Sequence, residues 1–110
     1  MRDLQFTDEF KAFKDGADEN VQKKIEYIFE ILRTQDIINA KTVKKLVNTH
    51  FYEMRIQVNN EYRVLLFTID HENINQARKV LFLNGFMKKA TKDYDKQIKQ
   101  AIKILEKWQQ

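Results

Sequence analysis

The middle of the chain alternates polar and apolar residues with a period of two, and this pattern constrains the fold more than any other feature. FYEMRIQV over 51–58, EYRVLLFTI over 61–69 and ARKVLFLN over 77–84 each predict a β-strand. They are separated by an Asn59-Asn60 turn and a polar loop over 70–75. Consecutive strands with such short connections pair side by side, so the three should form an antiparallel meander.

Helical periodicity precedes the meander. Residues 2–6 alternate and predict a short first strand, after which Thr7 can cap a helix that ends at Gly16. A second helix is predicted over 18–34. Its apolar residues, which form one amphipathic stripe, are Val21, Ile25, Ile28, Phe29 and Leu32.

The remaining segments complete an α+β pattern. Residues 35–48 are poorly periodic and are interpreted as a connection with a helical turn near 41–46. Residues 93–108 predict a C-terminal helix with an apolar stripe at 98, 102, 105 and 108. The expected fold is a short N-terminal strand, two helices, a three-stranded antiparallel meander that completes the sheet, and a last helix. One face of the meander must pack on the two early helices.

Composition limits the classes of protein to which the chain can belong. Its 110 residues suit one domain, so we expect a single domain over 1–110. The absence of Cys excludes disulfide scaffolds, thiolate-bound zinc and thiol catalysis. The acidic opening MRDLQFTDEF differs from a secretory signal, and no apolar run approaches a membrane span of about 18 residues. We therefore expect a cytoplasmic protein with no membrane association, no metal and no cofactor.

Positive charge is concentrated in the last third of the chain. The net charge is −3 over residues 1–36, +1 over 37–77 and +6 over 78–110. This distribution indicates either a surface that meets a polyanion or a solvated, lysine-rich terminal helix.

The register of the first hairpin decides where two arginines point. A two-residue loop at Asn59-Asn60 would pair Ile56 with Arg63 and mix charge into the apolar row. A three-residue loop over 59–61 pairs Ile56 with Val64 and gives one clean apolar face, so we prefer it. It places Arg55 and Arg63 together on the face opposite the two early helices. Alternatively, each arginine simply pairs with a carboxylate or reaches water.

The end of the third strand adds amines to this face. In NGFMKKATKDY, residues 84–94, Lys88, Lys89 and Lys92 follow the strand and precede the last helix. Together with Arg55 and Arg63 they should form a convergent basic site that can bind the phosphates of RNA and stabilise the charge of a phosphorane. Aromatic residues that can stack on a base are interleaved with it, namely Tyr62, Phe86 and Tyr94. A lysine or tyrosine whose pKa is lowered by the cations could move the protons.

The blocks FYEMRIQVNNEYRVLLFTID and VLFLNGFMKKATKDYDKQIKQA resemble the RelE/ParE toxin superfamily. Within it they are most similar to the HigB-type, phage Gp49-like branch, with its E-(L/M)-R, Y-R-V and H-G-F-x-K-K motifs in the same order over residues 50 to about 102. The resemblance implies the toxin of a type II toxin–antitoxin system. Such toxins act as ribosome-dependent mRNA endonucleases and are neutralised by an antitoxin, commonly a helix-turn-helix (HigA-like) DNA-binding protein.

The resemblance also implies roles for individual residues. Arg55 matches the E-(L/M)-R arginine, and Arg63 matches the Y-R arginine that stabilises the scissile phosphate. Lys88 and Lys89 match the paired lysines and Lys92 the lysine that follows them. Tyr94 has the spacing of a tyrosine that stacks on RNA or transfers a proton. Arg55, Arg63, Lys88, Lys89 and Tyr94 are thus the candidate catalytic residues, and Lys92, Tyr62, Phe86 and Asn84 are candidate RNA-binding residues.

The chain departs from the family pattern in two respects. Asn84 stands where the branch commonly has His, and Asp93-Tyr94 replaces a common Thr-Pro. His50 and His71 match no catalytic histidine and are expected at the surface, while Glu53 and Glu61 are expected to pair with the arginines. Two alternatives to the nuclease stay open because one fold hosts several functions: a ParE-like poison of DNA gyrase and a phage-derived module that only binds a partner.

Overall fold

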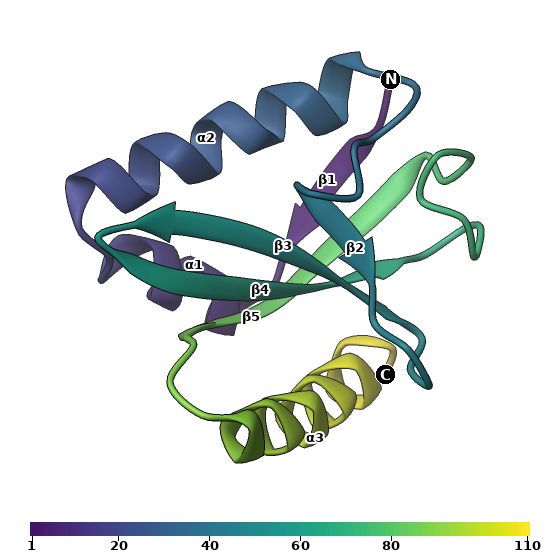
Figure 1. The fold of residues 1–110 in the computed structure, drawn as a ribbon. Helices are drawn as coiled ribbons and strands as arrows, with labels where there is room; N and C mark the ends of the chain where they lie inside the picture. Colours follow the sequence, from purple (N-terminus) through teal and green to yellow (C-terminus); the bar gives the residue numbers. More distant parts are fainter.

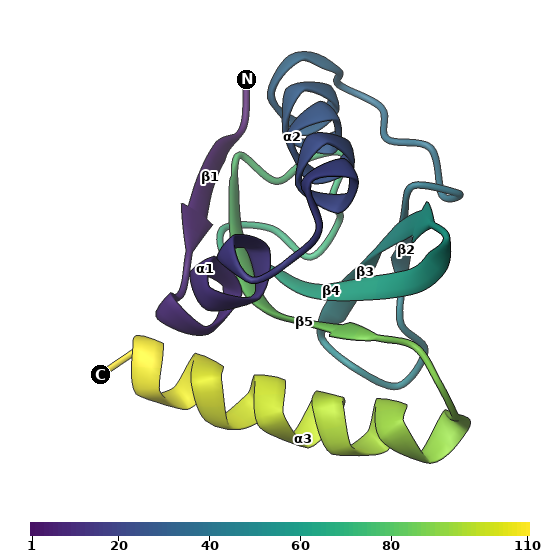
Figure 2. The ribbon, with the colours of Figure 1, turned by 90° about the vertical axis from the view of Figure 1, so that its left-hand side faces the viewer.

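The computed structural model covers residues 1–110 and confirms the α+β class. One mixed sheet lies between α1 and α2 on one face and α3 on the other (Figures 1 and 2). The elements are β1 (Asp3–Phe6), α1 (Asp8–Asp15), α2 (Glu19–Thr34), β2 (Val43–Lys45), β3 (Phe51–Val58), β4 (Asn60–Thr68), β5 (Lys79–Met87) and α3 (Thr91–Trp108). No helix combines the length and hydropathy needed to cross a bilayer.

The sheet has the strand order β1-β5-β4-β3-β2. Strands β3, β4 and β5 are antiparallel neighbours, which confirms the predicted meander. Strand β1 pairs with β5 in parallel. The helical turn expected near 41–46 is wrong, because Val43–Lys45 forms an edge strand antiparallel to β3. Three residues are too few to display a period of two, so this strand left no signal in the sequence.

The observed hairpin register corrects both sequence-based alternatives. Ile56 pairs with Tyr62, and Arg55 pairs directly with Arg63. Only Asn59 lies between the paired ends of the strands, with a φ of 61° that Asn tolerates better than most residues. The preferred register was shifted by two residues along β4. Because side chains alternate with a period of two, this shift leaves every residue on the face that was predicted for it.

Each face of the sheet carries its own apolar cluster. On the face of α1 and α2, Met54, Ile56, Val64 and Phe82 pack among the helix side chains. On the face of α3, the buried residues are Phe51, Leu65, Leu81, Leu83, Phe86, Ala101 and Ile104. Helix α3 buries positions 101 and 104 most completely, so Ile102 and Trp108 of the predicted stripe remain 44% and 39% exposed.

An irregularity in β5 sets the position of its last residues. Leu65 lies opposite Asn84, whereas the next residue, Leu66, lies opposite Phe82, so Leu83 is an extra residue in β5. Beyond this bulge Gly85 lies under α1, where a Cβ atom would come within 2.4 Å of the Phe13 ring. Glycine therefore allows α1 to pack directly on β5, just before the strand leads into the lysines at 88, 89 and 92.

Candidate RNA-binding and catalytic site

Arg55 and Arg63 lie side by side on the face of the sheet that α3 partly covers. They are directly opposed residues of β3 and β4, so their side chains leave the same face, as the sequence predicted. Their environments differ: the Arg55 side chain is 41% exposed, and that of Arg63 is only 6% exposed. The pair therefore combines a guanidinium that solvent can reach with one that is buried behind it.

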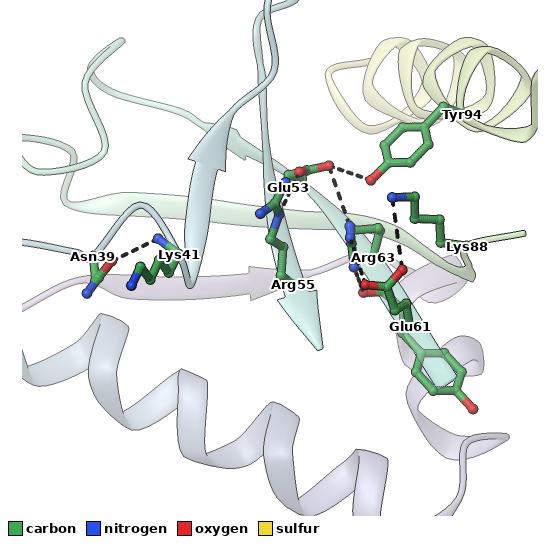
Figure 3. Close-up of polar contacts among 9 residues, drawn as sticks. Asn39, Lys41, Glu53, Arg55, Glu61, Arg63, Lys88 and Tyr94 are labelled. Carbon is green, nitrogen blue, oxygen red and sulfur yellow. Dashed lines mark hydrogen bonds and ion pairs between the residues drawn. The ribbon is translucent and has the colours of Figure 1, made fainter. Parts of the chain in front are cut away.

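The buried carboxylate of Glu53 joins the two arginines to α3 (Figure 3). Glu53 precedes Arg55 by two residues on β3 and is 3% exposed. Its Oε1 accepts a hydrogen bond of 3.0 Å from Arg55 Nε, and its Oε2 lies 3.9 Å from Arg63 Nε. A charged carboxylate is stable at such depth only with partners of this kind.

Tyr94 of α3 supplies the third contact to Glu53. Its hydroxyl donates a hydrogen bond of 2.6 Å to Glu53 Oε2, and its ring meets Phe86 edge to face at 5.3 Å. Burial, followed by the bond to the Glu53 carboxylate, raises the pKa of Tyr94 to about 12. Arg63 offsets only part of this rise. The pKa of Tyr94 is therefore not lowered as the sequence predicted, and Tyr94 is a neutral phenol at physiological pH that can donate a proton but not accept one.

Glu61 connects Arg63 to the first lysine after β5. Glu61 Oε1 lies 3.7 Å from an Arg63 Nη, and its Oε2 lies 4.0 Å from Lys88 Nζ. The backbone N–H of Lys88 also donates to the Glu61 carbonyl at 2.8 Å, which fixes the start of the 88–90 connection against the hairpin. The pairing of Glu53 and Glu61 with the arginines is thus confirmed.

The buried Arg63 guanidinium is incompletely bonded. One Nη donates to the Tyr62 carbonyl at 3.0 Å, but the two carboxylates lie beyond hydrogen-bond distance and Nε has no hydrogen-bond partner. A buried donor without a partner costs free energy, so this group gains from any acceptor that reaches it. An anionic oxygen beside Arg55 would be such an acceptor.

Lys89 and Lys92 are exposed and lie on the connection to α3 and on its first turn. Neither forms an ion pair. They follow Lys88, whose amine reaches the arginine face through Glu61. The segment 88–92 therefore continues the positive charge from the arginine pair onto α3.

Three candidate RNA-binding residues do not contribute an open surface. Tyr62 lies on the opposite face of the sheet, where its ring contacts Phe13. Phe86 is buried in the α3 cluster. Asn84 is buried as well, and its amide donates to the Gln97 side chain at 3.0 Å. None of them can stack on a base in this arrangement.

Glu53 contacts both arginines and Tyr94, whereas the sequence predicts only its pairing with an arginine. The signal was the placement of an acid two residues before Arg55, on the same face of a strand whose neighbours are buried. His50 and His71 are exposed, as expected. No cluster of three His, Cys, Asp or Glu side chains is arranged to hold a metal ion.

Comparison with known proteins agrees with this architecture. The family model described as phage-derived protein Gp49-like (DUF891) matches residues 8–106. No curated protein matches the chain in sequence.

Solved structures with a similar fold are RelE toxins. A free mutant of the E. coli toxin RelE has a TM-score of 0.61 at 18% identity, covering 91% of this chain and 93% of that one. RelE of the intact E. coli RelBE toxin–antitoxin complex has a TM-score of 0.59 at 14% identity and covers 82% and 100%. The RelB–RelE complex of Methanococcus jannaschii gives 0.57 at 22% identity, with 82% and 96% covered. The chain therefore belongs to the phage-derived Gp49-like family and has the fold of the RelE toxins.

Proposed function

We propose that the protein is the toxin of a type II toxin–antitoxin pair and cuts mRNA on the ribosome without a metal ion. The observation that carries this proposal is the arginine pair: two guanidinium groups on one face of the sheet, one buried and incompletely bonded, beside Lys88. Two adjacent guanidinium groups match the oxygens of a phosphodiester and favour the extra negative charge of its transition state. Family membership and the RelE fold support the same assignment.

In the proposed reaction the 2′-hydroxyl of a ribose releases its proton to solvent water as its oxygen attacks the adjacent phosphorus. The bond from phosphorus to the 5′-oxygen breaks, which leaves a 2′,3′-cyclic phosphate and a free 5′-hydroxyl. Arg55 and Arg63 hold the non-bridging oxygens, while the lysines at 88, 89 and 92 bind flanking phosphates. Tyr94 protonates the 5′-oxygen, because a leaving alkoxide is a stronger base than a phenolate even when the pKa of the phenol is about 12.

The proposed partner is an antitoxin with a helix-turn-helix DNA-binding domain. Two of the similar solved structures are RelE toxins bound to a RelB antitoxin. Net charge of +6 over residues 78–110 would complement an acidic segment of such a partner. Because the substrate is a message on the ribosome, the protein would act in the cytoplasm.

The experiment compares two arginine variants that differ in position and little else. Arg55 and Arg33 have side chains of 41% and 40% exposure, and each forms an ion pair with one glutamate. Induced expression of the wild type and of Arg33→Gln should stop growth, whereas Arg55→Gln should not. Primer extension on translated messages should map cuts inside codons for the two toxic proteins only.

Two results would contradict the proposal. Growth arrest with intact messages and inhibited DNA supercoiling would identify a gyrase poison instead. Intact messages without any growth arrest, together with binding to the product of the adjacent gene, would identify a module that only binds a partner.

A further inference from the structure

The outer side of α3 carries one lysine per helical turn along its whole length. Its lysines are Lys92, Lys96, Lys99, Lys103 and Lys107, all exposed. At 100° per residue they fall within a sector of about 80° around the helix axis. We call this set the lysine stripe. Ala101 and Ile104, which are the buried residues of α3, lie on roughly the opposite side of the helix.

The lysine stripe has almost no competing contacts. Only Lys107 forms an ion pair, at 3.5 Å with Glu9, and the other four lysines have no acidic partner. No other element covers the outer side of α3, which lies along one side of the molecule (Figure 2). Asp95 lies four residues before Lys99, and Glu106 lies three residues after Lys103, along one border of the stripe. Neither acid forms an ion pair with a lysine of the stripe.

The like-charged pairs within the stripe oppose helix stability. Lys92 and Lys96, Lys99 and Lys103, and Lys103 and Lys107 are like-charged pairs at i,i+4 spacing. Such pairs destabilise a helix, whereas alternating acids at the same positions would stabilise it. A chain that only needed a soluble helix would gain from a mixed surface, so the stripe indicates a polyanionic ligand.

The chemistry of the stripe selects the class of ligand. Protein interfaces rely on buried aromatic and arginine anchors and are depleted in lysine, and the stripe contains no anchor of that kind. It also contains no aromatic residue on which unpaired bases could stack. Lysines alone suit phosphates, which a double-helical nucleic acid presents in a continuous row along each strand.

We propose that the lysine stripe binds the phosphate backbone of double-helical RNA. The stripe is about 22 Å long between its first and last Cα atoms, which is enough to contact several phosphates. It begins at Lys92, next to Lys88 and Lys89, so RNA bound there adjoins the candidate site. The inference rests on the proposed function for one point only, which is the choice of RNA among the possible polyanions. An enzyme of this size that cuts mRNA needs a second contact to hold it beside its substrate.

The test uses a fluorescent RNA hairpin with a stem of about 16 base pairs and measures its affinity for the purified chain from about 50 to 200 mM salt. The stripe variant is Lys96→Gln, Lys99→Gln and Lys103→Gln. The matched control is Lys11→Gln, Lys23→Gln and Lys24→Gln, which removes the same charge from exposed lysines of α1 and α2 on the other face of the sheet.

The stripe variant should bind the hairpin at least about tenfold more weakly at low salt, and the slope of log affinity against log salt should become shallower by about 3. The control should behave like the wild type. The stripe variant should also melt no earlier than the wild type, because it has lost like-charge repulsion. Equal losses in both variants, or none in either, would overturn the inference.

Further measurements distinguish RNA binding from the binding of other polyanions. If poly-glutamate competes with the hairpin at equal charge concentration, or if a DNA duplex binds more tightly, the assignment to RNA is wrong. The proposed function is judged separately by the Arg55→Gln experiment. If hairpin binding depends on the stripe but mRNA is not cut, the RNA-binding role of the stripe stands and the proposed nuclease function is wrong. If mRNA is cut but hairpin binding does not depend on the stripe, the nuclease function stands and the role of the stripe is wrong.

Discussion

At the scale of single residues, the charged face depends on Glu53. Its buried carboxylate is the counter-charge of Arg63, which is buried too. Glu53→Gln should lower the free energy of unfolding by about 2 to 4 kcal/mol, because it leaves the guanidinium without a buried counter-charge. Glu61→Gln, at a carboxylate that is 47% exposed, should cost less than about 1 kcal/mol. Urea unfolding followed by circular dichroism measures both, and equal costs would contradict the role of Glu53.

Tyr94 gives this face a dependence on alkaline pH. Its pKa rises from 10.0, the value expected in the unfolded chain, to about 12 in the folded one. Folding therefore favours the neutral phenol: the contribution of Tyr94 to stability is complete below pH 10 and is lost as the pH rises towards 12. Urea midpoints of the wild type should fall more steeply over this window than those of Tyr94→Phe. Parallel curves would show that the pKa of Tyr94 is not raised.

The sequence predicted on which face of the sheet the site residues lie better than it predicted which of them solvent can reach. Alternation along β3 and β4 was sufficient to place Arg55 and Arg63 together. The same alternation assigns Tyr62 to the apolar row, so its inclusion with the basic residues conflicted with the preferred register. The burial of Phe86 and Asn84 depends on where α3 lies over the sheet, and no local pattern in the sequence encodes that position.

At the scale of elements, the contact between α1 and β5 depends on Gly85. A methyl group there would overlap the Phe13 ring. Gly85→Ala should destabilise the fold by about 1 to 3 kcal/mol, because helix and strand must move apart. Phe13→Leu in the same chain should recover part of that loss. Thermal melts of the single and double variants test this coupling, and additive losses would show that the two residues do not interact.

Element boundaries followed the sequence only in part: β5 spans Lys79–Met87, whereas the pattern placed this strand over 77–84. Strand β3 and the end of α2 fall where the pattern placed them. The sequence pattern did not predict strand β2 or the observed hairpin register, for two physical reasons. A strand of three residues carries no measurable period, and a period of two cannot distinguish registers that differ by two residues.

At the scale of the whole molecule, two apolar clusters share one sheet. Strands β4 and β5 contribute alternate residues to both, so neither cluster can lose its packing without disturbing the other. We expect a single unfolding transition. The lone tryptophan, Trp108, lies at the end of α3 and reports on that helix, whereas far-ultraviolet circular dichroism reports on all elements. Their urea midpoints should coincide, and an earlier fluorescence transition would show that α3 detaches first.

The two outermost strands are the shortest of the sheet. Strands β1 and β2 have four and three residues, while the three strands between them have eight or nine. Each edge of the sheet is thus a very short strand that offers few unpaired backbone groups to another molecule. Strand β1 pairs with Lys79–Phe82 of β5, and β2 pairs with Tyr52–Met54 of β3. Concentrated samples should accordingly resist fibril formation, and a substitution that lengthened β2 into residues 46–50 would remove that protection.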